Sequence, residues 1–388
     1  MNRIPYGRQD INQADIDAVS EILKSDFITQ GPTIINFEKA VADYCSAQYA
    51  TAVNSATSAL HIACMALELG PGDILWSSPN TFVASTNCAL YLGASVDFVD
   101  IDPQTYNMSV DALEKKLVEA ERIGKLPKVV VPVHFTGQPC DMQRISELSR
   151  KYEFRIIEDA SHAIGAKYNG ETVGNCRYSD ITVFSFHPVK IITTGEGGMA
   201  VTNSPDLSFK MQRYRSHGIT SDTDRMEPRP EDEIWGYQQI TLGYNYRMTD
   251  IQAALGLSQL NRLDEYVIKR QAIAAYYNEN LQGLHLVVPH QEAISYSSYH
   301  LYVVRLKTLQ KGITQKQVFE KMRSNGIDVN LHYIPVYLQP YYQALGFKRG
   351  QCPEAEAYFK ETMSIPMFPA LTDGNLDKVV QVLKGIIG

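Results

Sequence analysis

Short apolar runs alternate with longer helical stretches between residues 49 and 202, and this pattern restricts the fold more than any other feature of the chain. Continuous apolar runs of strand length that alternate with helices are typical of parallel strands buried on both faces of a sheet. We therefore predict an α/β domain with a large, mostly parallel sheet. Ligands of such sheets bind beyond the carboxyl ends of the strands. The predicted strands cover residues 50–53, 74–77, 96–99, 129–133, 155–157, 181–184 and 199–201.

The regions on either side of this sheet have helical patterns. Asn12 with Asp15 predicts a helix cap, followed by an apolar stripe that includes Ile16 and Leu23. After a loop, a second helix should run through Phe37 and Val41 to Tyr44. Residues 221–233 are charged and hold two prolines, which favours an exposed loop. Thr249 with Gln252 predicts another helix cap, after which helices alternate with a few strands such as 300–306. We predict an N-terminal arm and large domain over residues 1–250, and a smaller C-terminal α+β domain over residues 251–388.

Charge and composition restrict the class of partner. The net charge of −7 provides no basic face for nucleic acid and no polybasic membrane patch, so we expect a small-molecule partner. The chain has neither an apolar run of membrane-spanning length nor an apolar leader, which predicts a cytoplasmic protein. The six cysteines include no C-x-x-C pair and the nine histidines show no metal-ligand spacing, so we expect reduced thiols and no metal site.

Lys190 lies on a predicted bend between two buried segments. An apolar run ends at Phe186, Pro188 prevents a regular continuation, and a Gly-rich turn then leads into the next apolar run. A lysine in such surroundings can lose its proton near neutral pH and form a Schiff base with a carbonyl. Considered alone, a lysine at an ordinary turn is the more frequent case.

Three further segments follow predicted strands and favour a catalytic role for Lys190 over an ordinary turn. Hydroxyl residues at 55–58 open a helix, where backbone N–H groups bind phosphate, although Ser and Thr also cap helices in general. Asp159 follows a buried strand, and is either a structural cap, a metal ligand or a partner for a ring nitrogen. Phe82 is either a core residue or an aromatic that covers a ring. Together with Lys190, which is 31 residues beyond Asp159, these are the parts that a pyridoxal phosphate site requires.

Four motifs resemble those of the DegT/DnrJ family of nucleotide-sugar aminotransferases. They are Asn54-Ser55-Ala56-Thr57-Ser58-Ala59-Leu60, Glu158-Asp159-Ala160-Ser161-His162, the stretch from Phe184 to Gly198 around Lys190, and Gly243-Tyr244-Asn245-Tyr246-Arg247-Met248. The resemblance implies a fold-type I pyridoxal phosphate-dependent transferase that forms a homodimer with shared active sites. Some relatives with His at the lysine position are dehydratases, so Lys190 argues for transamination.

The resemblance also implies a role for each matching residue. Lys190 would form the Schiff base, Asp159 would meet the pyridine nitrogen and Phe82 would stack on the ring. His162 would lie near the cofactor hydroxyl, and Asn245 would reach the phosphate from the neighbouring subunit. The remaining phosphate-side residues would be Ala56, Thr57, Ser58 and Ser185.

Three segments, residues 4–11, 26–29 and 331–339, look most like one branch of the family. That branch aminates C4 of a UDP-linked 4-keto-6-deoxy-N-acetylhexosamine on the route to pseudaminic acid. The substrate would be UDP-2-acetamido-2,6-dideoxy-β-L-arabino-hexos-4-ulose, with L-glutamate as amino donor. The implied substrate contacts are Tyr6, Asp26, Phe27, Ile28, Thr29, His332, Tyr333, Val336 and Tyr337. The aromatic residues in this set could equally well pack in an interface or in the core.

Three alternatives remain. The first is amination at C3, or of another UDP- or dTDP-linked keto sugar. The second is a Rossmann-type nucleotide-sugar oxidoreductase, which is disfavoured because no G-x-G-x-x-G opens a helix after a strand. The third is a regulatory homologue without enzymatic activity, which the presence of both Lys190 and Asp159 disfavours.

Overall fold

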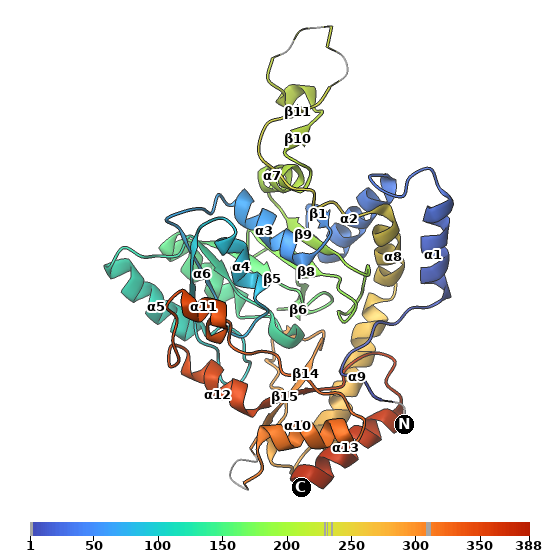
Figure 1. Cartoon of the computed structure of the whole chain (residues 1–388), viewed down its shortest axis with the longest axis vertical. Coiled ribbons are helices and arrows are strands. Elements are labelled where there is room, and N and C mark those ends of the chain that lie inside the picture. Colours follow the sequence, from blue (N-terminus) through green and yellow to red (C-terminus); the bar gives the residue numbers. More distant parts are fainter. Residues whose placement is uncertain (1–2, 229, 231, 234–235, 308–311) are drawn as a thin grey trace.

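A seven-stranded sheet forms the centre of the computed structural model, which describes residues 3–228, 230, 232–233, 236–307 and 312–388 (Figure 1). The strand order is β1-β9-β8-β5-β4-β2-β3, and β9 alone runs antiparallel to its neighbours. The predicted mostly parallel sheet is therefore confirmed, and no predicted strand end differs by more than two residues from the observed one. The strands are β1 Tyr49–Val53, β2 Ile74–Ser77, β3 Ser95–Phe98, β4 Val129–Val131, β5 Arg155–Asp159, β8 Ile181–Ser185 and β9 Gly198–Thr202.

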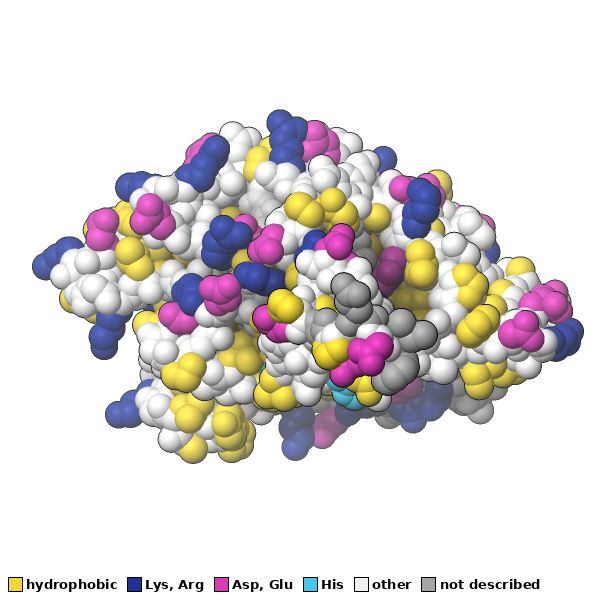
Figure 2. Space-filling view, turned by 90° about the horizontal axis from the view of Figure 1, so that it is seen from above, with side chains coloured by type: hydrophobic (Ala, Val, Ile, Leu, Met, Phe, Trp, Pro, Cys, Tyr) yellow, Lys and Arg dark blue, Asp and Glu magenta, His cyan; other side chains and the backbone are white. Residues whose placement is uncertain are grey.

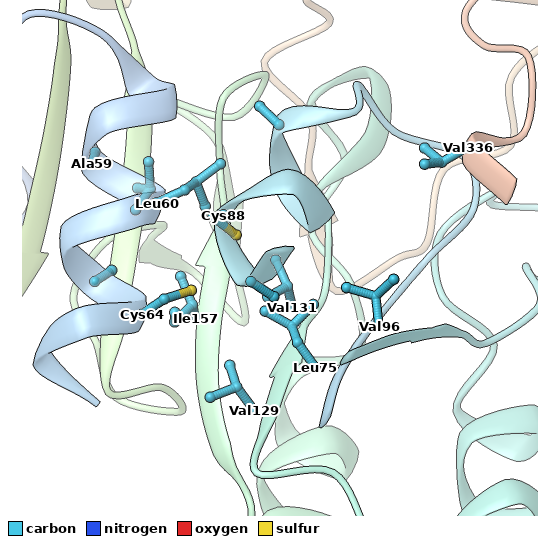
Figure 3. Close-up of a cluster of buried hydrophobic side chains, with 14 of the residues drawn as sticks. Ala59, Leu60, Cys64, Leu75, Cys88, Val96, Val129, Val131, Ile157 and Val336 are labelled. Atoms are coloured by element: carbon cyan, nitrogen blue, oxygen red, sulfur yellow. The ribbon is translucent and has the colours of Figure 1, made fainter. Parts of the chain in front are cut away.

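Helices cover both faces of this sheet, which explains why its strands are continuously apolar. Successive residues of one strand enter different cores, since Val129 and Val131 pack with α3 and α4 whereas Val130 packs with α5 and α6. Figure 3 shows the first of these cores between α3 and the strands. The helices of the sheet domain are α2 Pro32–Cys45, α3 Ala56–Ala66, α4 Ala84–Leu90, α5 Val110–Arg122, α6 Met142–Tyr152 and α7 Pro205–Arg215.

Both predicted capping boxes are present. Asn12 caps α1, Gln13–Lys24, with Asp15 returning the contact, and Thr249 with Gln252 does the same for α8, Asp250–Leu260. The two helices pack against each other at the edge of the molecule. The apolar stripe of α1 is not covered by its own chain, because Ile16 and Leu23 are 51% and 60% exposed.

The C-terminal part has a sheet and a core of its own. Its strands β12 Leu286–Val287, β14 Tyr302–Leu306 and β15 Thr362–Ile365 are antiparallel, which confirms the strand predicted at 300–306. The division at residues 250 and 251 stays a prediction. The helices here are α9 Leu263–Asn280, α10 Gln315–Ser324, α11 Pro340–Ala344, α12 Pro353–Glu361 and α13 Asp373–Ile387. A third sheet joins β6 Lys167–Tyr168, β7 Glu171–Thr172 and β13 Ser295–Tyr296, and short 3-10 turns cover Phe135–Gly137, Thr223–Arg225 and Val336–Leu338.

A hairpin of β10, Ile219–Thr220, and β11, Gln238–Gln239, projects from the body (Figure 1). The described residues of the loop between its strands are mostly exposed, as predicted for 221–233. Figure 2 shows that charges of both signs are mixed over the face seen from above. All six cysteines are buried and free, and no described helix has the length and apolar character needed to cross a membrane.

Candidate active site

A pocket of about 610 Å³ opens where the sheet meets the C-terminal part of the chain, which is within the size range of small-molecule sites. Its walls come from the carboxyl ends of β5 and β8, the start of α3 and the loop after β2. The N-terminal arm and residues 330–334 complete it. The position agrees with the rule that open α/β sheets bind ligands beyond their strand ends.

Lys190 and Asp159 both line this pocket. Asp159 ends β5, whereas Lys190 lies on the loop that follows the neighbouring parallel strand β8. Burial lowers the pKa of the half-buried Lys190 amine to about 8, and the charge of Asp159 opposes that shift. The two side chains therefore converge as predicted, and the lysine gives up its proton far more easily than an ordinary lysine.

One hydroxyl and one backbone N–H hold the Asp159 carboxylate. Ser85 donates to Oδ2 at 2.6 Å and is itself 2.6 Å from the hydroxyl of Thr81, while the Ser161 N–H donates to Oδ1 at 3.1 Å. The preceding residue, Glu158, points away from Asp159, because successive side chains of a strand alternate, and its Oε2 lies 2.6 Å from His134 Nε2. Asp159 is thus fixed as an acceptor whose carboxylate faces the pocket.

The amino terminus of α3, for which phosphate binding is predicted, lies at one end of the pocket. Ala56, Thr57 and Ser185 line the pocket. Ser58 does not, because its hydroxyl donates to Asn54 Oδ1 at 2.6 Å, and so its predicted contact with phosphate is not supported. Gly198 is required here, since a Cβ at this position would lie 2.5 Å from the backbone N of Ala56.

Three histidines surround the lysine. His162 Nε2 lies 3.2 Å from the Tyr333 hydroxyl, and its ring is 4.4 Å from that of His300. Burial, with the charge of Lys190 next in importance, lowers the pKa of His332 to about 3 and that of His162 well below its ordinary value. The imidazoles are therefore neutral. Nδ1 of His162 and of His300 is buried and has no hydrogen-bond partner among the described residues, as expected for groups that meet a ligand.

The predicted substrate residues divide into three groups. Tyr6, His332 and Tyr333 line the pocket, as does Phe82, a residue that is 60% exposed. Val336 and Tyr337 are instead fully buried in the core, where Figure 3 shows Val336 and where the Tyr337 hydroxyl donates to Glu356 at 2.7 Å. Their prediction as substrate contacts is not supported, because core packing accounts for Val336, and core packing with the hydrogen bond to Glu356 accounts for Tyr337.

The third group lies outside the pocket of its own chain. Phe27 and Ile28 are exposed on the segment between α1 and α2, together with Asp26 and Thr29. Asn245 is exposed too, on an extended segment that pairs with Ser216. Their predicted roles require a second subunit and stay predictions.

The sequence did not reveal two residues of the site. Ser85 has no sequence signal, because its importance comes only from the contact with Asp159. His300 is predicted from the sequence as the start of a strand, whereas it precedes β14 and lines the pocket. Among the described residues no group of His, Cys, Asp or Glu is arranged to hold a metal ion.

The chain thus brings to one pocket an easily deprotonated amine, a fixed carboxylate, a helix N-terminus, an exposed aromatic ring and an unpartnered imidazole nitrogen. This combination fits pyridoxal phosphate, and the fold is that of fold-type I pyridoxal phosphate-dependent transferases. Fold and pocket together define a sugar aminotransferase. The chain belongs to the DegT/DnrJ/EryC1/StrS aminotransferase family, whose model matches residues 9–384.

Individual relatives match this chain over nearly its full length. The chain is 38% identical over 367 residues, 94% of its length and 92% of the relative's, to the UDP-4-amino-4,6-dideoxy-N-acetyl-β-L-altrosamine transaminase of Campylobacter jejuni subsp. jejuni. It is 35% identical over 390 residues, 99% of its length and 98% of the relative's, to the GDP-perosamine synthase of Caulobacter vibrioides. These matches leave no support for an oxidoreductase.

Solved structures of aminotransferases have the same fold as this chain. The aminotransferase PseC of Helicobacter pylori, involved in the biosynthesis of pseudoaminic acid, superposes with a TM-score of 0.89 at 29% identity over 99% of both chains. The putative sugar aminotransferase Spr1654 of Streptococcus pneumoniae has been solved in a PLP form, with a TM-score of 0.88 at 30% identity over 99% of this chain and 98% of that one.

Proposed function

We propose that the protein transfers the amino group of L-glutamate to C4 of UDP-2-acetamido-2,6-dideoxy-β-L-arabino-hexos-4-ulose, with pyridoxal phosphate as cofactor. Glutamate would leave as 2-oxoglutarate, and the product would be UDP-4-amino-4,6-dideoxy-N-acetyl-β-L-altrosamine. The observation that carries the proposal is the convergence of Lys190, with its lowered pKa, and Asp159 in one pocket.

Different residues of the pocket would have different roles in this reaction. Pyridoxal phosphate, when bound, supplies the electron sink that makes the α-proton of an amino acid acidic. Lys190 would bind its carbonyl carbon and carry a proton between the α-carbon of the amino acid and that cofactor carbon, which requires an amine that loses its proton near neutral pH. Asp159, held by Ser85, would keep the ring nitrogen protonated. Phe82 would cover the ring, and the start of α3 would hold the phosphate.

We further propose a homodimer in which each pocket is completed by the partner. Lys190 is the sole lysine or arginine among the described residues that line the pocket, whereas a nucleotide diphosphate carries two or more negative charges. The exposed apolar side chains around α1 form a surface suited to burial by a second copy, as in obligate dimers. They are Ile16, Leu23, Phe27, Ile28 and Ile35, which are each at least 49% exposed. In this arrangement Asn245 and the segment 26–29 reach the site of the neighbouring subunit.

The choice of sugar rests on the similarity to the transaminase of C. jejuni and on the pocket residues Tyr6, His332 and Tyr333. Their rings and donors suit a uracil base and a diphosphate. A 6-deoxy sugar suits the apolar Phe27 and Ile28, because a buried hydroxyl without a partner costs about 1 to 3 kcal/mol.

The test compares kcat/KM for this keto sugar, its D-xylo epimer, a dTDP analogue and a GDP-linked 4-keto sugar, each with L-glutamate. We expect the β-L-arabino UDP substrate to be preferred. A preference for any competitor by about tenfold or more, which corresponds to about 1.4 kcal/mol of transition-state binding, would refute the substrate assignment and leave sugar amination intact.

A further inference from the structure

Arg270 on α9 is a buried guanidinium with no acidic partner in the described part of the chain. Arg270 is only 1% exposed. Its Nη1 donates to three carbonyl oxygens, those of Tyr299 at 3.0 Å, His300 at 3.2 Å and Met367 at 3.0 Å. Burial lowers the pKa of Arg270 to about 9, so the group is still charged at neutral pH. A buried charge without a counter-ion is costly, and packing alone does not explain it.

Two of these carbonyls belong to the segment that carries His300 into the pocket. Tyr299 has a φ of +45°, a left-handed conformation that a bulky residue adopts only when its surroundings enforce it. The same segment is held on its other side, where the Ser298 hydroxyl donates to the carbonyl of His162 at 2.8 Å. Arg270 therefore helps to fix a strained turn next to the imidazole pair of the pocket.

The third carbonyl connects Arg270 to a different wall. Met367 accepts from Arg270 through its carbonyl, and its own N–H donates to the carbonyl of Tyr6 at 3.0 Å. Tyr6 lines the pocket with its ring 5.6 Å from that of His332. One guanidinium thus joins the N-terminal arm to the turn before β14, although the two segments are almost 300 residues apart in sequence.

We propose that Arg270 is a positioning residue that holds Tyr6 and His300 in place on the substrate side of the pocket. The inference rests on the proposed function, because it takes the pocket to be the sugar nucleotide site. All three bonds come from Nη1, which the planar guanidinium holds in a fixed position, whereas a lysine ammonium lies on a flexible stem.

The experiment compares Arg270→Lys and Arg270→Met with wild type and with a control, Thr202→Val. Thr202 is buried on β9 and its hydroxyl donates to the carbonyl of Asp180 at 2.7 Å, so the control loses a buried hydroxyl whose hydrogen bonds involve neither pocket segment. The first measurement is amide hydrogen exchange at residues 4–8, 297–301 and 367–368 in the protein without substrate. The second is the separation of KM from kcat for the 4-keto sugar nucleotide.

Loss of the carbonyl contacts should speed exchange in all three segments by about two- to tenfold, as expected from a hydrogen bond of about 0.5 to 1.5 kcal/mol. KM should rise by about fivefold or more while kcat stays within about twofold, because the chemistry at Lys190 does not involve these contacts. Thr202→Val should lower the Tm without either effect.

Arg270 variants that lower the Tm but leave exchange in these segments and KM at wild-type values would overturn the inference. Arg270→Lys keeps the charge and decides the question if Arg270→Met does not fold. A failure of the proposed function is distinguishable, since it would appear in the wild type as absence of sugar amination, whereas the exchange data report the coupling of the two segments in any case.

Discussion

Replacement of Lys190 by methionine should stabilise the protein once its cofactor has been removed. Burial lowers the pKa of Lys190 from 10.5 to about 8, which means that the pocket disfavours the charged amine by about 3 kcal/mol. Part of the side chain is still accessible to water, so we expect about 1 to 3 kcal/mol of added stability at pH 7 for Lys190→Met. Active-site residues often lower the stability of the folded protein in this way, because activity requires a group that the folded structure does not favour.

The effect should depend on pH in a defined direction. An unfolded lysine keeps its proton up to a pKa of 10.5, whereas the folded Lys190 loses it near 8, so unfolding takes up a proton between these values. The wild-type protein therefore becomes more stable as the pH rises from 8 to 10.5, and its difference from Lys190→Met narrows.

Urea unfolding of the cofactor-free proteins at pH 7 and pH 10, at one protein concentration, measures this difference. Lys115→Met provides the control, because Lys115 is exposed on α5 and its replacement should change stability by no more than about 0.5 kcal/mol. A Lys190→Met protein no more stable than wild type at pH 7, or a difference that is the same at both pH values, would refute the electrostatic account of Lys190.

The other predictions concern the same pocket. Asp159→Asn should lower kcat by about a hundredfold or more, since a neutral amide cannot hold a proton on the ring nitrogen, and a near-wild-type rate at saturating cofactor would make Asp159 a structural cap. Ser85→Ala removes the 2.6 Å donor to Asp159 and should lower kcat about five- to tenfold, the effect of one buried hydrogen bond, with Thr86→Val on the same helix as the comparison. Mixing inactive Lys190→Ala and Asn245→Ala proteins should restore up to about a quarter of wild-type activity if sites are shared between subunits. No recovery, with subunit exchange verified, argues against shared sites.

The sheet and its ligand-binding edge were predictable from the sequence because both depend on local pattern. Each strand is continuously apolar since helices cover both faces, and the capping boxes at Asn12 and Thr249 depend on residues three positions apart. Asp159 ends β5 and Lys190 lies on the loop after the neighbouring strand β8, so their convergence follows from the strand order.

The parts that were not predictable depend on contacts between distant segments. Ser85 is a common residue whose role arises only from its position beside Asp159, 74 residues away. Tyr337 resembles Tyr333 in sequence context, yet Glu356 satisfies its hydroxyl in the core while Tyr333 faces the pocket. Arg270 has no local signal at all, because its three acceptors come from two other regions of the chain.

The most direct test of the central claim is the absorbance spectrum of the purified protein with pyridoxal phosphate, before and after addition of L-glutamate. We predict a visible band that glutamate bleaches with release of one 2-oxoglutarate per active site, and that Lys190→Ala lacks while its fold is retained. A wild-type protein without that band, or a Lys190→Ala protein that still aminates a keto sugar without added amine, would contradict the assignment of Lys190 as the residue on which the transfer depends.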